Sequence, residues 1–242
     1  MDGDVVYKLH RPGTDPRALT VRLRTAARLE CFLTPLSTEP ERVGMRWRTR
    51  WPRVETVVPE PDCLPWADAG RLLARLHAEA VGDRLPPHGW PGRLRRTVER
   101  LRRKDADEVV TIRRAAAGLP PEAWRAGSPD RPRTLVHGDW HLGQLGRRSA
   151  HEPWLLIDVD DLGFGDPAWD LARPAGFWAA GLIPDADWAT FVDAYRDAGG
   201  AALPPSPTDP WPVLDPFARA GVVQAAAGNP DELLLAACAR MA

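Results

Sequence analysis

Residues 137–144 read HGDWHLGQ, and the segment LLID follows at residues 155–158. An apolar pair leads into the first segment, which predicts a short buried strand that ends in a glycine-containing turn. The second segment is another apolar run that ends in a carboxylate, and we expect it to form a second strand. The chain therefore presents Asp139 on a loop, a carboxamide at Gln144 and a second carboxylate at Asp158, in that order.

Asp139, Gln144 and Asp158 are the residue types that phosphoryl transfer from a nucleotide requires. One carboxylate orients the attacking hydroxyl, while a carboxamide and a second carboxylate hold Mg²⁺ on the phosphates. The spacing matches the kinase pattern, except that Gln144 stands where that pattern has asparagine. We therefore predict Asp139 as the catalytic base, and Gln144 and Asp158 as metal ligands. Each residue also has a purely structural alternative. Asp139 could form an Asx turn, Gln144 could be a surface glutamine, and Asp158 could cap a helix or turn.

Two histidines and one lysine complete the set of candidate residues. His137 and His141 lie four residues apart, but glycines at positions 138 and 143 argue against a helix that would carry a zinc pair. We expect His137 to brace the loop, and His141 either to brace it or to line the site. Lys8 on the first strand could pair with phosphates if Glu30 supplies its acidic partner. A surface lysine is the alternative.

Composition restricts the class of protein. The chain has 242 residues, of which 44% are hydrophobic and 27% charged, as in an ordinary globular protein. Its three widely spaced cysteines support neither a disulfide framework nor a zinc knuckle and favour a reducing compartment. No signal peptide opens the chain, and no apolar run reaches the roughly 18 residues of a membrane span. We expect a cytoplasmic protein that binds neither membranes nor nucleic acid.

The hydrophobic pattern predicts strands mainly near the N-terminus and helices in the rest of the chain, which is an α+β organisation. Proline-containing residues 59–62 are predicted to be a linker between a domain at 1–60 and a domain at 61–242. The predicted strands are 5–9, 43–47 and 54–58. The predicted helices are 16–33, about 68–80, about 94–117, from 185 or 187 to 199, and from about 231.

Three segments together resemble the aminoglycoside phosphotransferase and choline kinase-like superfamily of small-molecule kinases. Residues 137–144 are similar to its H-G-D-x-H-x-x-N motif, and Ile157-Asp158 with GDPAWDLA at 165–172 is similar to its metal segment. LLARLHA at 72–78 is similar to its Leu-x-x-Leu-His helix. The resemblance implies a protein-kinase-like fold of two lobes, with a truncated β-rich N-terminal lobe and a mainly helical C-terminal lobe.

The resemblance also implies the reaction, which is Mg²⁺-dependent transfer of the γ-phosphoryl group of ATP to a hydroxyl of a small molecule. By position, Asp139 would be the base, Gln144 and Asp158 the metal ligands, and Asp170 a loop-stabilising residue. Lys8 and Glu30 would be the ion pair of the N-terminal lobe.

Two departures from the family pattern leave an alternative open. Gln144 is similar to the His-Leu-Gly-Gln form of maltokinase-like members. No G-x-G-x-x-G segment is present, and Lys8 lies close to the first residue of the sequence. We therefore also consider a truncated nucleotide-binding module with weak or no activity. A metal-dependent phosphoesterase is a third alternative, but the further His and Asp ligands of a two-metal site are not found.

The acceptor substrate is not determined by these motifs. Acidic residues outnumber basic ones after residue 136, and this part of the chain could attract a cation such as an aminoglycoside. Solvent-facing helix surfaces explain the same acids equally well. A sugar acceptor fits the glutamine form of the motif too. The acids concerned are Asp185, Asp187, Asp193 and Asp197.

Overall fold

The computed structural model describes residues 4–58, 60, 64–101 and 106–242, and it shows an α+β fold of helices and small antiparallel sheets. The strands are β1 (Val5–Leu9), β2 (Glu41–Val43), β3 (Arg46–Pro52), β4 (Glu55–Thr56), β5 (Thr134–Val136), β6 (Leu145–Arg147), β7 (Leu155–Leu156) and β8 (Gly163–Gly165). The helices are α1 (Pro16–Ala26), α2 (Trp66–Ala78), α3 (Trp90–Leu101), α4 (Asp107–Ala117), α5 (Ala168–Ala179), α6 (Asp185–Asp197), α7 (Trp211–Gly228) and α8 (Glu232–Met241), with short 3-10 helices η2 (Pro121–Trp124) and η3 (Leu142–Gln144).

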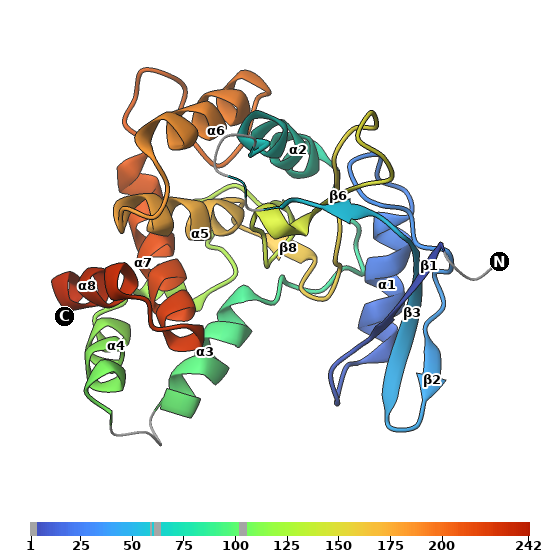
Figure 1. Ribbon diagram of the computed structural model, residues 1–242, viewed down its shortest axis with the longest axis horizontal. Helices are drawn as coiled ribbons and strands as arrows, with labels where there is room; N and C mark the ends of the chain where they lie inside the picture. Colours follow the sequence, from blue (N-terminus) through green and yellow to red (C-terminus); the bar gives the residue numbers. More distant parts are fainter. Residues whose placement is uncertain (1–3, 59, 61–63, 102–105) are drawn as a thin grey trace.

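The N-terminal sheet has the strand order β1-β3-β2, and α1 lies beside it at one end of the molecule (Figure 1). Asp15 caps α1 by accepting a hydrogen bond from the Arg17 amide, and proline at the first helical position suits the start of a helix. In the sheet, Lys8 lies opposite Thr49. This pairing fixes which residues of β1 face the rest of the chain, because side chains alternate along a strand.

Two sequence predictions in this part are wrong. The predicted strand at 43–47 contains the turn between β2 and β3, where Gly44 adopts a φ of +59° that favours glycine. The helix predicted to reach residue 33 ends at Ala26. The chain then runs beside β7, because the Leu156 amide donates to the Cys31 carbonyl and the Leu33 amide donates to the Leu156 carbonyl.

Two small sheets form the centre of the molecule. The first has the order β4-β6-β7, so a strand from the N-terminal segment pairs with strands that follow residue 144. The second pairs β5 with β8, with Leu135 opposite Phe164. This pairing holds the loop after β5 and the segment after β7 close together, which is where the motif residues lie.

The helices pack around these sheets, with α5 against α7 and α2 against α6. Gly176 of α5 permits close packing, because a Cβ atom there would lie 2.7 Å from the Ala218 carbonyl oxygen of α7. Large aromatic side chains fill the core, and Trp140 stacks on Phe191 with ring centroids 5.3 Å apart. None of the helices in the described part of the chain is both long and apolar enough to cross a membrane.

The remaining predictions for helices have mixed outcomes. Helices near 68–80, 185–199 and after 231 are confirmed as α2, α6 and α8. The single helix predicted for 94–117 is wrong, since α3 and α4 are separate helices, and α7 has no counterpart among the predictions. Residues 59, 61 and 62 of the linker predicted at 59–62 lie outside the described residues, so the boundary between 1–60 and 61–242 stays a prediction.

Candidate active site

The buried carboxylate of Asp170, on the first turn of α5, binds the backbone of the loop that carries Asp139. Asp170 accepts hydrogen bonds from the His137 amide at 2.7 Å and from the Gly138 amide at 2.9 Å. His77 of α2 lies 3.1 Å from the same carboxylate. Burial alone would raise the pKa of Asp170, but the hydrogen bonds from His77 and the loop lower it overall. Asp170 is therefore a buried anion that fixes the backbone of the loop.

The loop geometry depends on a glycine and a histidine. Gly138 has a φ of +81°, and a Cβ atom there would lie 2.3 Å from the Asp161 carbonyl oxygen, so only glycine fits. His137 is buried, and its Nε2 donates to the Ile157 carbonyl at 2.8 Å while its Nδ1 accepts from the Asp139 amide. The imidazole thus links the Asp139 loop to the residue directly before Asp158.

A cavity of about 400 Å³ brings together three of the predicted site residues, and we call it the Asp158 cavity. Lys8, Gln144 and Asp158 line it. Asp158 adopts a φ of 69°, which is uncommon for a residue with a side chain and is typical of functional sites. The apolar part of the lining includes Leu33, Trp51, Val54 and Ile157.

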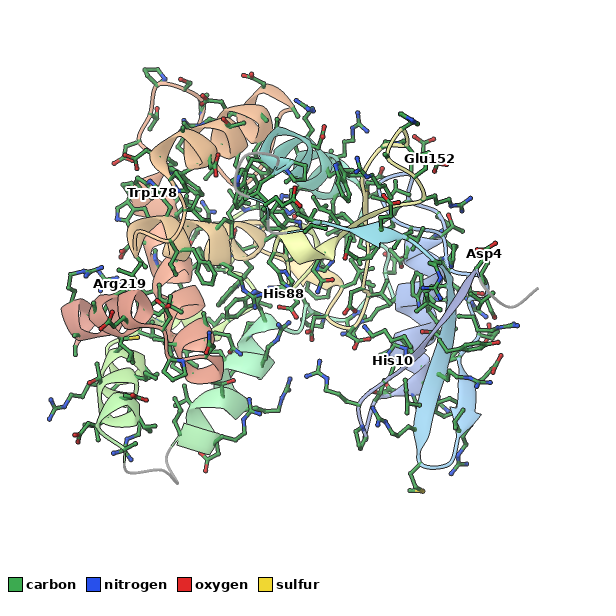
Figure 2. The ribbon with its side chains drawn as sticks, viewed as in Figure 1. Asp4, His10, His88, Glu152, Trp178 and Arg219 are labelled. Carbon is green, nitrogen blue, oxygen red and sulfur yellow. The ribbon has the colours of Figure 1, made fainter. Side chains whose placement is uncertain are left out.

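Lys8 bonds to two carboxylates of the segment after β7. Its Nζ lies 2.5 Å from Asp158 Oδ1 and 3.1 Å from Asp160 Oδ2. Asp160 is also 2.7 Å from His10 Nδ1, and His10 Nε2 is 2.9 Å from Thr49 Oγ1. Burial alone would raise the pKa of Asp160, but His10 and Lys8 hold it well below its usual value. Figure 2 shows His10 on the side of the N-terminal sheet that faces the helical part of the molecule.

The predicted ion pair between Lys8 and Glu30 is wrong. Glu30 is exposed and lies in a turn beyond the end of α1, and α1 itself contains no acidic residue. The carboxylate of Asp160, which comes from the other side of the cavity, contacts Lys8 instead. The early end of the helix is the physical reason, because it removes Glu30 from the helical face that the prediction assumed.

Asp139 forms ion pairs with two arginines. Arg93 of α3 and Arg173 of α5 both bond to Asp139 Oδ1, the second at 3.1 Å. Arg93 also donates to the Gly138 carbonyl at 2.8 Å and contacts Asp161. Among the described residues, a side-chain hydrogen bond is found to Asp139 Oδ1 but none to Oδ2, so Oδ2 is the oxygen left to accept a hydrogen bond.

A second cavity, of about 250 Å³, is lined by Arg173 and by the two residues that directly follow Asp139, and we call it the Arg173 cavity. His141 and Arg173 are its polar lining residues. Burial, assisted by the charge of Arg173, lowers the pKa of His141 from 6.5 to about 4, so its imidazole is neutral at pH 7. The apolar walls include Trp66, Trp140, Leu142, Phe177 and Ile183.

The motifs did not reveal four charged residues of this region. Asp160 and Asp161 could have been suspected, because they directly follow Asp158 in the sequence. Arg93 and Arg173 carry no such signal, since they lie on separate helices among many other arginines. Among the described residues, no cluster of three or more His, Cys, Asp or Glu side chains is arranged to hold a metal.

A family model described as the phosphotransferase enzyme family matches residues 37–217, which include the loop, both carboxylates and α5. The chain belongs to the phosphotransferase enzyme family. No curated protein sequence matches the chain. The match confirms the predicted family and the prediction of an enzyme of the small-molecule kinase type.

Solved structures similar to this phosphotransferase share its fold at low sequence identity. An aminoglycoside phosphotransferase from Streptomyces rimosus, in complex with ADP and streptomycin, has a TM-score of 0.64 and 16% identity, covering 92% of this chain and 88% of that one. A spectinomycin phosphotransferase with ADP and spectinomycin gives 0.58 and 15%, covering 96% and 77%. A choline/ethanolamine kinase family protein from Mesorhizobium loti gives 0.55 and 18%, covering 98% and 87%. These likenesses confirm the predicted kinase-like α+β fold class.

Proposed function

We propose that this phosphotransferase moves the γ-phosphoryl group of ATP to a hydroxyl of a small molecule and requires Mg²⁺. The observation that carries the proposal is that Lys8, Gln144 and Asp158 line one cavity, while the loop that presents Asp139 is bonded to the backbone beside Asp158. A cation, two oxygen ligands and a base are thereby combined at one site.

The Asp158 cavity has the lining that a nucleotide needs. Leu33, Trp51, Val54 and Ile157 offer apolar surface to a flat base, as in most ligand pockets. Lys8 is half-buried at the same cavity and is placed to contact phosphate oxygens. Two of the similar structures are described with bound ADP, which supports nucleotide use by this chain.

The residues at this cavity also fit Mg²⁺. A hard cation takes oxygen ligands, and it is often held by one or two carboxylates together with phosphate oxygens and water. The Gln144 carboxamide and the Asp158 carboxylate provide two such oxygens on the lining of one cavity. When bound, Mg²⁺ would neutralise charge on the phosphates. The pairing of β6 with β7 keeps the two ligands together, because the Ile157 amide donates to the Gln144 carbonyl at 2.9 Å.

Asp139 orients and deprotonates the acceptor. Its Oδ1 is held by Arg93 and Arg173, so Oδ2 is available for the acceptor hydroxyl. The acceptor oxygen forms a bond to the γ-phosphorus, and the bond from that phosphorus to the bridging oxygen breaks with its electron pair going to ADP. The hydroxyl proton passes to the Asp139 carboxylate. His137 and Asp170 hold the loop in place, and His141 lines the Arg173 cavity.

Calorimetry with the full chain, ATP and MgCl₂ tests the proposal, followed by measurement of ADP release with hydroxyl compounds. We expect binding that weakens when EDTA removes the metal. An absence of binding at millimolar nucleotide would contradict the proposal, whereas binding of nucleotide without turnover of any hydroxyl compound would favour the truncated nucleotide-binding module. Binding of nucleotide without any Mg²⁺ dependence would contradict the roles of Gln144 and Asp158.

A further inference from the structure

The Arg173 cavity indicates what kind of acceptor the enzyme takes, and this inference rests on the proposed function. Asp139 does not itself line the cavity, but Arg173 belongs to both the lining and the ion pair with Asp139, and the two residues that directly follow Asp139 also line it. Its remaining walls are mainly aromatic and aliphatic side chains. The acceptor body in contact with these walls is therefore apolar.

The polar groups of the Arg173 cavity are hydrogen-bond donors. The indole N–H groups of Trp66 and Trp140 have no acceptor in the described part of the chain, but both nitrogen atoms are shielded by neighbouring atoms, so a ligand in the cavity does not reach them. His141 Nδ1 accepts from the Gly143 amide at 3.1 Å, so the neutral imidazole carries its hydrogen on Nε2. The Nε2–H group of His141 and the Arg173 guanidinium are therefore the donors of the lining residues, and they favour a ligand that brings acceptor oxygens.

Arg173 adds a positive charge with unused donors. The contact to Asp139 occupies one of the five N–H donors of its guanidinium. Its side chain is 22% exposed, and burial lowers its pKa, so a second anion beside it restores interactions that water no longer provides. No Asp or Glu is among the residues that line the cavity.

A polycationic acceptor does not fit this arrangement. An aminoglycoside needs carboxylates for its ammonium groups, whereas the carboxylate next to the cavity, Asp139, already faces two guanidinium groups. The acidic residues of α6 do not line the cavity, and Asp185, Asp193 and Asp197 are exposed to solvent. We therefore favour the alternative in which these acids form a solvent-facing helix surface over the one in which they attract a cationic substrate.

We propose that the acceptor is a hydroxy acid with an apolar body. Its carboxylate binds Arg173, its apolar part contacts Trp66, Trp140 and Phe177, and its hydroxyl donates to Asp139 Oδ2. The product of the reaction is then the phosphate ester of that hydroxy acid, formed together with ADP.

A matched set of three probes tests the charge of the acceptor. Phenyllactate supplies the carboxylate, and two analogues replace this carboxylate by a hydroxymethyl or an aminomethyl group while keeping the same hydroxyl and phenyl ring. Binding to the full chain is measured by calorimetry with and without ATP and MgCl₂. We expect phenyllactate to bind at least about tenfold more tightly than the aminomethyl analogue, as for a charge-assisted hydrogen bond.

Two substitutions of Arg173 assign the preference to this residue. In Arg173→Gln the preference for phenyllactate should fall to less than about twofold, because the charge is lost. In Arg173→Lys, part of the preference for phenyllactate should return. Arg219→Gln is the matched control, since it also removes an arginine from a pair with aspartate but lies on α7, far from the N-terminal sheet (Figure 2). This control should keep the wild-type preference.

The outcomes distinguish the proposed hydroxy-acid acceptor from the proposed kinase function. Equal or tighter binding of the aminomethyl analogue, tightest binding of the neutral analogue, or binding of none of the three overturns the hydroxy-acid assignment. An unchanged preference in Arg173→Gln overturns the role of Arg173. If ATP and MgCl₂ bind normally in these cases, the kinase function still stands. If nucleotide does not bind, the proposed function fails, and the preference measured without nucleotide still tests the acceptor.

Discussion

The ion pairs at Asp158, which lines the Asp158 cavity, and at Asp139, whose partner Arg173 lines the Arg173 cavity, have opposite proportions of charge, although the two carboxylates are close in the sequence. At the first, Asp158 and Asp160 face the single ammonium group of Lys8. At the second, Asp139 faces the guanidinium groups of Arg93 and Arg173. The first arrangement suits a metal cation held between carboxylates and phosphates, and the second suits an anionic ligand.

This difference shows that the net charge of a segment is a poor guide to the charge of its site. Acids outnumber basic residues after residue 136, yet two arginines surround the carboxylate that we assign as the base. Arg93 comes from the arginine-rich part of the chain and bonds to both Asp139 and Asp161. Charges that decide recognition at a site are therefore set by packing between helices.

The largest expected effect is the loss of turnover in Asp139→Asn. The carboxamide keeps the size of the side chain but cannot take the proton of the acceptor, so ADP release should fall about 10²- to 10⁴-fold. Binding of ATP with MgCl₂ at the Asp158 cavity should stay within about twofold of wild type. Wild-type turnover on a genuine acceptor would show that Asp139 is not the base. The difference in charge between the surroundings of Asp139 and Asp158 would then have no role in catalysis.

The second effect is on stability, in Asp170→Asn. Asp170 accepts from the His137 and Gly138 amides and contacts His77, and it is fully buried. A carboxamide can accept through one oxygen only, so at least one of these donors loses its acceptor. The free energy of unfolding, measured with urea, should fall by about 2–4 kcal/mol. Asp193→Asn, on the exposed face of α6, is the control, and an equal loss there would contradict this explanation.

The sequence predicted the local part of this site well. The strand before the loop, the glycine turn and the strand before Asp158 are formed by neighbouring residues, so periodicity and turn chemistry were sufficient. The spacing identified Gln144 and Asp158, and Lys8 was a candidate from its place on the first strand; the structure places all three at one cavity. Their roles in binding and catalysis stay predictions.

The sequence did not predict the partners of these residues, because partners are chosen by tertiary packing. Lys8 and Asp158 are 150 positions apart, and the helix expected to carry Glu30 ends earlier than its pattern suggested. Arg173 reaches Asp139 from 34 positions away, on a helix face fixed by the packing of α5 against α7. The prolines within α7 also hid that helix, since proline inside a helix argues against one.

The third expected effect is weaker binding of ATP with MgCl₂ in Asp158→Asn, which tests the metal-binding role of the Asp158 cavity. Replacing one oxygen ligand by a neutral group should weaken binding of ATP with MgCl₂ about tenfold and should reduce the effect of EDTA to near zero. The acceptor preference at the Arg173 cavity should be unchanged, because Arg173 does not contact Asp158. A lost acceptor preference would show that the two cavities are not independent in charge.

The smallest expected effect is a change in the pKa of His141, which reports the positive charge at the Arg173 cavity. Burial and the nearby Arg173 charge lower the pKa of this imidazole to about 4. Arg173→Gln removes a positive charge that disfavours the imidazolium, so the pKa should rise, by about one unit at most because burial remains the larger cause. Titration of the imidazole signals by NMR measures the change, with Arg219→Gln as the control. An unchanged or lower pKa in Arg173→Gln would mean that the guanidinium does not govern the charge of this cavity, and the contrast with the Asp158 cavity would then fail.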